Sequence, residues 1–286
     1  MTCERSELTV DTTKQSGFLL PPAGVADLKV TQVRVLRSEW TKLRSLRSTY
    51  LTLTIAMALT VGLGALFSFG TQSRWARMSA LQKAAFDPTA TSLNGFFLTQ
   101  LAIGVLGVLV FSGEYPTAMI RATFAAVPTR LPVLWAKLAV FAAVTFVLMT
   151  LTSVASFLVG QAVLSSENLG TTLGAPSVLR AVIGCALYLT VVAILGVSLG
   201  AILRSSAGGI ATLVGLLLVV PILARLLPSD WADSINKYLP SNAGQAMLRV
   251  VPEPSSLAPW TGLALFVGYA TVAVVIAAVL ITRRDA

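Results

Sequence analysis

The side chains that could do chemistry inside the apolar part of this chain are mainly hydroxyls and amides. They recur within long apolar stretches, at Thr99, Gln100, Thr145, Thr152 and Ser156, where they could line a path for an amphipathic molecule. The same groups also serve helix–helix hydrogen bonding in a membrane, so both interpretations stay open. Histidine is absent from the sequence, which removes the commonest general base and metal ligand. These residue types favour binding or packing over covalent chemistry.

Several functional classes are disfavoured by motifs that the sequence lacks. It contains no G-x-x-x-x-G-K-[ST] loop for nucleotide phosphates and no His/Cys/carboxylate cluster with metal-ligand spacing. Cys3 lies in the polar N-terminal segment and Cys185 in the fourth apolar stretch, so we expect no disulfide between them. The centres of the apolar stretches carry no ionisable residue, which disfavours an ion-coupled secondary transporter. We expect no catalytic residue, no metal site and no cofactor on this chain.

Six stretches of twenty or more residues carry no charge, although 12% of the chain is charged. They run over 48–73, 88–113, 138–166, 181–203, 205–224 and 254–282. About 20 apolar residues suffice for a helix to cross a bilayer core. The hydrophobic content of 55% and the mean hydropathy of +0.80 agree with this interpretation. The sequence predicts an all-α polytopic membrane protein with six transmembrane helices.

Charge at the ends of the apolar stretches predicts the orientation. The expected spans are 50–69, 95–111, 133–159, 178–203, 209–227 and 259–281. With both termini on the inner side, fourteen Lys and Arg lie inside and seven outside. Because short inner loops carry the excess of Lys and Arg, we expect cytoplasmic termini in a bacterial plasma membrane.

A basic amphipathic segment precedes the first span. The expected division is a flexible cytoplasmic leader (1–27), an interfacial helix (28–48), a six-helix transmembrane domain (49–282) and a cytoplasmic tail (283–286). In the interfacial helix an apolar stripe of Leu36, Trp40 and Leu43 lies beside basic residues such as Arg44. The alternative is a solvated basic run that only follows the charge rule for orientation.

The inner loop between spans two and three is unusually apolar. Glu114 and Pro116 suit the first turn of a short helix over 114–128, which Pro128 would end. Met119, Ile120 and Phe124 would then project as an apolar knob suited to docking another protein, with Arg121 beside them. The alternative, equally supported, is that these side chains pack back against the spans.

The outer loop before span six carries aromatic residues at helical spacing. Trp231 and Tyr238 would lie on one face of a short interfacial helix, followed by an apolar piece over 243–251. Together they could form an outer gate, or simply a loop anchored by its aromatics. Within span five, Pro221 should kink the helix.

The segment from Arg37 to Thr49 that leads into the first span resembles the start of type-2 ABC transporter permeases of the actinobacterial type. The inner loop from Gly113 to Arg130 and the stretch from Tyr238 to Gly244 are similar to the same family. The resemblance implies a permease that pairs with a second permease and with two separate ATP-binding subunits, and we expect the second permease to be an identical copy. It also implies an elbow helix at 30–48 and a coupling helix at 114–128 seated in a groove of the ATPase.

We therefore expect a subunit that exports an amphipathic or hydrophobic compound, an antibiotic, another drug or a lipid, using ATP and Mg bound on the partner. No nucleic acid is expected as a partner, since the cations gather at the ends of the spans. A secondary transporter and a non-transporting sensor, immunity factor or scaffold remain the alternatives.

Overall fold

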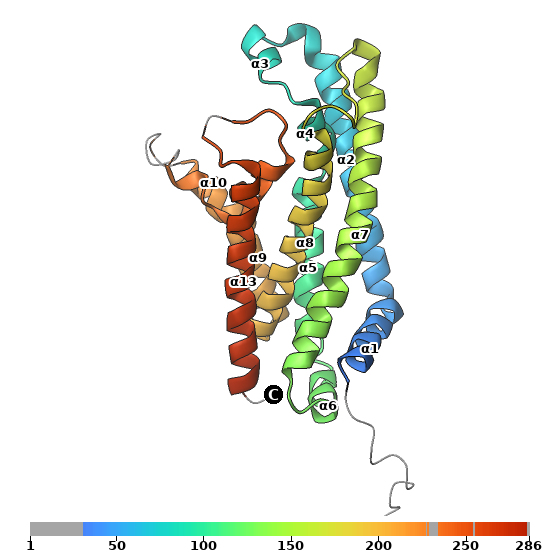
Figure 1. Ribbon diagram of the computed structural model, residues 1–286, viewed down its shortest axis with the longest axis vertical. Helices are drawn as coiled ribbons and strands as arrows, with labels where there is room; N and C mark the ends of the chain where they lie inside the picture. The colour runs from blue at the N-terminus through green and yellow to red at the C-terminus, as the bar shows by residue number, and fades with distance from the viewer. Residues whose placement is uncertain (1–30, 227, 229–233, 254, 285–286) are drawn as a thin grey trace, which may run out of the picture.

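The protein is an elongated bundle of helices with its long axis along the expected membrane normal (Figure 1). The computed structural model describes residues 31–226, 228, 234–253 and 255–284. It is 81% helical, and the described part of the chain contains no strand, which confirms the all-α prediction. The expected leader, 1–27, lies outside the described residues.

Five helical stretches are long and apolar enough to cross a membrane, and a sixth apolar helix is shorter. The helices of these spans are α2 (Arg47–Arg74), α5 (Phe96–Ser112), α7 (Leu131–Leu164), α8 (Val178–Leu203), α9 (Ser206–Val214) with α10 (Val220–Ala224), and α13 (Pro259–Arg283). The short one is α5, whose 17 residues rise about 25 Å. These helices confirm a polytopic membrane protein.

Helix α8 is the centre of the bundle. Its most apolar window is 72% buried, whereas the other four long helices bury 28–33% of theirs. It packs most extensively against α5, where Gly196 of α8 meets Gly104 of α5. A Cβ on Gly196 would lie 2.4 Å from the Gly104 carbonyl oxygen, so this crossing requires glycine. Gly107 of α5 faces Gly196 as well, since a Cβ on either residue would lie 3.3 Å from the Cα of the other.

Helix α7 extends past both ends of the predicted third span. Its 34 residues rise about 51 Å, against about 30 Å for a bilayer core. One end therefore reaches α1, and the other reaches α4. This length lets α7 contact both α1 and α4 (Figure 1).

Span five is interrupted where Pro221 was expected to disturb it. A π-helical turn, Gly215–Val219, separates α9 from α10, and the Val220 N–H donates to the Gly215 carbonyl. Proline cannot donate to the carbonyl four residues back and its ring collides with that group. A wider turn just before Pro221 removes this collision, so the disturbance takes the form of a π turn.

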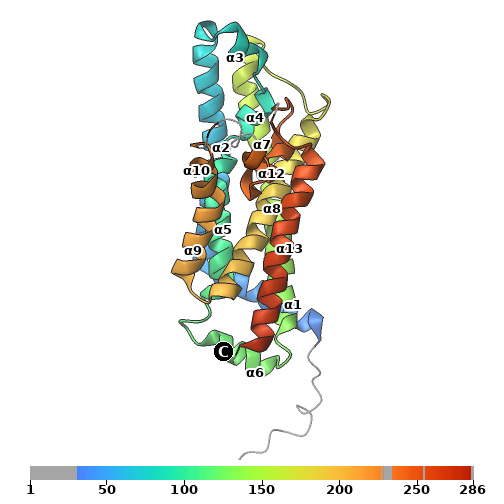
Figure 2. The same cartoon turned by 90° about the vertical axis from the view of Figure 1, so that its left-hand side faces the viewer.

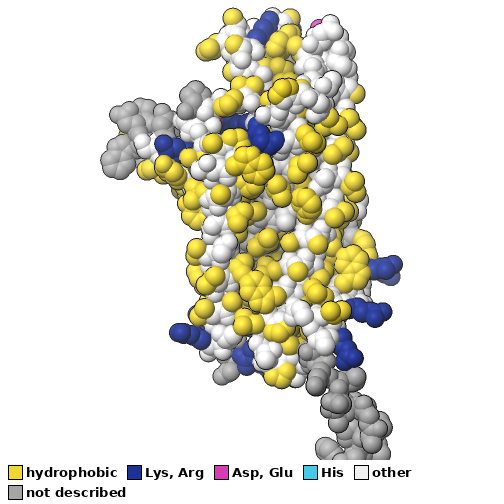
Figure 3. Space-filling model, in the orientation of Figure 1, with side chains coloured by type: hydrophobic (Ala, Val, Ile, Leu, Met, Phe, Trp, Pro, Cys, Tyr) yellow, Lys and Arg dark blue, Asp and Glu magenta, His cyan; other side chains and the backbone are white. Residues whose placement is uncertain are grey.

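Short helices cover the two ends of the bundle. At one end lie α1 (Gln32–Ser45) and α6 (Met119–Ala126), close to the end of α13 (Figure 2). Toward the other end are α3 (Ala80–Ala84), α4 (Pro88–Leu93) and α12 (Pro240–Gln245), with 3₁₀ turns at Trp75–Arg77, Ser165–Glu167 and Ala246–Leu248. Lys and Arg side chains gather at the α1 end of the visible face, and its middle is apolar (Figure 3).

Candidate functional site: an inner charge cluster

Four ionisable side chains meet at the end of the bundle that carries α1 and α6, which we call the inner end after the orientation expected from the sequence. The inner charge cluster consists of Glu39 and Lys42 from α1, Glu114 from the segment after α5, and Lys137 from α7. The Lys137 Nζ lies 2.6 Å from Glu114 Oε1 and 2.7 Å from Glu39 Oε2. The Lys42 Nζ lies 2.8 Å from Glu39 Oε1 and 3.1 Å from Glu114 Oε1. Two ammonium groups and two carboxylates thus form a neutral set.

The inner charge cluster is withdrawn from solvent. Lys137 is 2% exposed and Glu39 is 5% exposed, and Lys137 also donates to the Val110 carbonyl oxygen of α5 at 3.3 Å. Burial alone would lower the pKa of Lys42, but its hydrogen bond and charge contact with Glu39, followed by those with Glu114, raise that pKa above its ordinary value. The charged form of Lys42 is therefore favoured although its ammonium group is partly buried.

The position of Glu114 corrects the expected coupling helix. Helix α6 begins only at Met119, after Ala118 adopts a left-handed conformation with φ of 55°. Glu114 lies in the preceding turn and does not stand at a helix N-terminus, so the expectation of a helix over 114–128 beginning at Glu114 is wrong. The turn instead directs the carboxylate inward, where the two ammonium groups supply its partners.

Helix α6 presents two different faces. Ile120 and Phe124 are 2% and 7% exposed and belong to the hydrophobic core, so packing against the spans describes them better than a projecting knob. Met119 is 46% exposed, and Arg121 is exposed as well. On the inward side, Thr123 Oγ1 accepts a hydrogen bond from Lys42 Nζ at 3.2 Å, which connects α6 to the inner charge cluster. The exposed face is therefore the one available to a partner.

Helix α1 also has a buried face and an exposed face. Val35 and Glu39 are buried, whereas Trp40 is 48% exposed and Arg44 is exposed. Leu36 and Leu43 are partly buried against the core. Trp40, Leu43 and Arg44 border an apolar groove of about 540 Å³ between α1, α2 and α7. This arrangement suits a helix that lies at a membrane surface with its apolar residues facing the bilayer.

The polar residues predicted to line a path are enclosed within the single chain. Thr99, Gln100, Thr145, Thr152 and Ser156 are all at most 2% exposed. Three of them form hydrogen bonds to another helix: the Thr99 and Thr60 hydroxyls lie 2.7 Å apart, Ser156 donates to the Ser92 carbonyl at 2.7 Å, and Gln100 accepts from the Tyr188 hydroxyl. Thr152 donates to the Leu148 carbonyl within α7 at 2.7 Å. Four of the five thus act in packing, while the Thr145 hydroxyl has no partner among the described residues.

The outer residues divide between described and undescribed positions. Trp231 lies outside the described residues. Tyr238 is 51% exposed, its carbonyl oxygen accepts from the Tyr269 hydroxyl at 3.0 Å, and it borders an apolar groove beside α13. The apolar piece expected over 243–251 is split between α12 and a 3₁₀ turn that ends at Leu248.

A single carboxylate connects two outer loops. Asp87 Oδ1 accepts from the Thr89 and Ala90 N–H groups at the start of α4. Its other oxygen accepts from the Val250 and Val251 N–H groups at 2.7 and 3.0 Å. Four backbone donors therefore converge on one side chain, which fixes the first outer loop against the segment after α12.

Sequence reasoning missed Glu39 and Lys137 as site residues. Glu39 is the one acid among five Lys and Arg between residues 34 and 47, and Lys137 is the cation that lies farthest inside a predicted span. Glu39 is thus an acid within a basic segment, and Lys137 is a cation within an apolar span. Pairing them would have required knowing that α1 packs along α7.

Comparison with known protein families gives one match for this chain. A family model described as "ABC-2 family transporter protein" matches residues 35–226. The matched stretch runs from α1 to α10 and contains the whole inner charge cluster. Among curated proteins, no match was found.

Proposed function

Because this chain belongs to the ABC-2 transporter family, we propose that it is the permease subunit of an ATP-driven exporter for an amphipathic or hydrophobic compound. Family membership makes it a multi-pass membrane component of an ABC transporter, and it implies partnership with an ATP-binding ABC subunit. The direction of transport and the cargo, an antibiotic, another drug or a lipid, are the proposed part.

The assembly that we propose contains two copies of this chain and two ATP-binding subunits in the plasma membrane. Both termini lie in the cytoplasm, which places α1 and α6 beside the ATPases. ATP and Mg bind to those subunits, so hydrolysis takes place on the partners. Cysteines introduced at residues 170 and 125 test the orientation: an impermeant thiol reagent should label only the first on intact cells.

The inner charge cluster is the observation that supports coupling through this end of the molecule. It joins α1, the segment before α6 and α7 through ion pairs of 2.6–3.1 Å. A displacement of α6 by an ATPase is therefore passed to the long helix α7 by charged contacts, in addition to apolar packing. Met119 and Arg121 lie on the exposed face that would contact the ATPase. In this mechanism α6 and α7 tilt together when the ATPases close.

An amphipathic cargo agrees with the apolar grooves that open on the sides of the bundle. The groove beside Trp40 measures about 540 Å³, and the groove beside Tyr238 about 520 Å³. Both are bordered by an aromatic side chain at one end and by spans along their length. A hydrophobic compound within a leaflet could reach such surfaces without entering water.

The experiment is reconstitution of the permease with its ATP-binding subunit in vesicles. The readouts are stoichiometric co-purification, cargo-stimulated ATP hydrolysis and transport. Lys137→Met should reduce cargo stimulation, while Arg77→Met, which removes an exposed cation at the opposite end, should not. Failure to co-purify any ATPase would reject the exporter. Normal stimulation of ATP hydrolysis in a folded Lys137→Met variant would reject coupling through the inner charge cluster but would leave the exporter proposal standing.

A further inference from the structure

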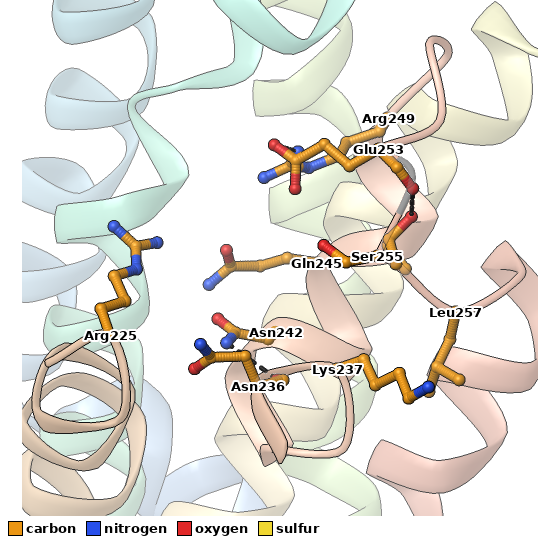
Figure 4. A pocket seen from close by; sticks show the side chains of 11 residues that line it. Arg225, Asn236, Lys237, Asn242, Gln245, Arg249, Glu253, Ser255 and Leu257 are labelled. Carbon is orange, nitrogen blue, oxygen red and sulfur yellow. Dashed lines mark hydrogen bonds and ion pairs between the residues drawn. The ribbon is translucent and has the colours of Figure 1, made fainter. Parts of the chain in front are cut away.

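A polar pocket of about 340 Å³ opens at the outer end of the bundle, between α10 and the segment that contains α12 (Figure 4). The described residues that define it are Arg225, Asn236, Lys237, Asn242, Gln245, Arg249 and Glu253, with Ser255, Ser256 and Leu257 at its edge. We call it the outer basic pocket. Its lining is polar, unlike the two apolar grooves, so it is suited to a different kind of ligand.

Positive charge predominates among the residues that line the outer basic pocket. Arg225, Lys237 and Arg249 contribute three cations, against the single carboxylate of Glu253. Glu253 forms an ion pair with the Nη1 group of Arg249, and the Glu253 side chain is 57% exposed. Since a guanidinium carries five N–H donors, Arg249 keeps donors for another acceptor.

Two of these cations approach the pocket from opposite sides. Arg225 extends from the end of α10 toward the segment that carries Gln245 and Arg249 (Figure 4). Burial lowers the pKa of Arg249, nearby Asp87 opposes this effect, and the charge of Arg225 lowers the pKa further. The two guanidinium groups therefore repel each other across the pocket. An anion between them would remove this repulsion.

Amide side chains complete the wall that faces Arg225. Asn236, Asn242 and Gln245 point toward the Arg225 side, whereas Lys237 extends toward Leu257 (Figure 4). Asn242 Nδ2 donates to the Asn236 carbonyl at 3.0 Å, which holds two of these residues together. The side-chain oxygen of Asn236 is buried and has no partner among the described residues. This oxygen is an acceptor, so the group that pairs with it must be a donor, such as a hydroxyl adjoining the anionic group of a ligand.

We propose that the outer basic pocket binds an oxyanion, a phosphate or carboxylate group, held between Arg225 and Arg249 and flanked by the amides of Asn236 and Gln245. Guanidinium groups bind such anions through paired N–H donors, and the amides supply hydrogen bonds to neighbouring oxygens or hydroxyls. The group can belong to a free anion or to the headgroup of a lipid at the outer surface. This site concerns binding alone and does not depend on the proposed export.

The test measures saturable binding to the purified full-length chain in an uncharged detergent. Inorganic phosphate is titrated against chloride of equal ionic strength, and phosphatidylglycerol is titrated against phosphatidylcholine. Binding is followed by the shift in thermal unfolding. Arg225→Gln should weaken binding of the effective probe about tenfold, the loss expected for one charge-assisted hydrogen bond. Arg225→Lys should weaken it less, because the charge is kept.

Arg74→Gln is the matched control, since Arg74 is also an exposed arginine near the outer end of a span and does not line the pocket. Binding of both phosphate and phosphatidylglycerol supports a general oxyanion site. Binding of phosphatidylglycerol alone identifies a lipid headgroup, and binding of phosphate alone identifies a soluble anion. Absence of saturable binding, or equal losses in Arg225→Gln and Arg74→Gln, overturns the proposal.

Discussion

Lys137 of α7 and Glu114, which precedes α6, lie 2.6 Å apart although 23 residues separate them in the chain. Glu39 of α1 contacts the same ammonium group from the other side at 2.7 Å. One lysine thus holds two carboxylates whose mutual repulsion would otherwise separate α1 from the α6 segment. Lys42, which is more exposed, also contacts both Glu39 and Glu114. The inner end of the protein depends on charge balance as well as on apolar packing.

Replacing Lys137 with Met should destabilise the folded chain by about 3–5 kcal/mol, because it leaves two carboxylates together in a buried site. The measurement is the thermal midpoint of the purified permease in detergent. Adding Glu39→Gln and Glu114→Gln to the Lys137→Met chain should recover part of the loss by removing the uncompensated charge. A midpoint no lower than that of the Arg77→Met control would show that the inner charge cluster contributes little.

Stability should fall at high pH through Lys42. The folded-state pKa of Lys42 lies above the ordinary value of 10.5, so its contribution is complete below 10.5 and is lost as the pH rises through the higher folded value. Thermal midpoints of the wild type and Lys42→Met should therefore differ at about pH 9 and converge above the folded pKa. Other groups also titrate in this range, and the comparison between the two chains removes their effect. A constant difference would contradict the assignment.

Asp87→Asn should loosen the contact between the first outer loop and the segment after α12. The amide keeps one acceptor oxygen where the carboxylate has two, so two of the four backbone N–H groups lose their partner. The expected loss is about 0.5–1.5 kcal/mol per hydrogen bond, because these N–H groups are only partly buried or exposed. Hydrogen exchange should increase at the pair of N–H groups that the one amide oxygen no longer serves, Val250 and Val251 or Thr89 and Ala90, whereas exchange near the inner charge cluster should not change. Unaltered exchange at all four N–H groups would contradict this role.

Gly196→Leu should prevent normal packing of α8 on α5. Even a Cβ would lie 2.4 Å from a backbone oxygen, and the backbone of α5 cannot turn aside as a side chain could. We expect a loss of about 1–3 kcal/mol or more and a low yield of folded protein. Gly268→Leu in α13 is the control, since nothing lies within 4 Å of the Cβ position there. Equal yields of the two variants would show that the α5–α8 crossing tolerates separation.

Substitutions on α6 should separate docking from folding. Met119→Asp and Arg121→Glu change the exposed face and should weaken binding of the ATP-binding subunit about 30-fold, as for an interface anchor worth about 2 kcal/mol. Ile120→Asp changes the buried face and should lower the thermal midpoint of the permease by itself. Affinity capture of the ATPase and thermal unfolding report the two effects. Normal capture by both exposed-face variants would place the ATPase contact elsewhere.

The spans were predictable because an apolar run of bilayer length is a local property of the sequence. Span four was predicted as 178–203, the range that α8 occupies. The start of α6 was not predictable in the same way: Ala118 takes a left-handed conformation that its residue type does not favour. Tertiary contacts decide that turn, because Glu114 gains two ammonium partners when the chain turns before Met119.

The site was less predictable than the fold for a related reason. Glu114 was predicted as a helix-end acid, whereas Lys42, like Glu39 and Lys137, was not predicted as a site residue. Their function in the inner charge cluster depends on which helices become neighbours, and periodicity carries no such information. The apolar pattern of α6 was correctly noticed, but its direction was ambiguous, since Ile120 and Phe124 fit an inward face as well as an outward one.

The π turn in span five determines the direction in which the side chains of α10 and Arg225 point about the helix axis. A π turn holds one residue more than an α turn, and each residue in a helix advances the side chains by about 100°. If the same five residues, Gly215–Val219, wound as an ordinary α-helix, α10 would be rotated by about that angle. Arg225, which follows α10 directly, would then face away from the outer basic pocket. The wide turn absorbs one extra residue and thereby lets the end of span five present Arg225 to the pocket.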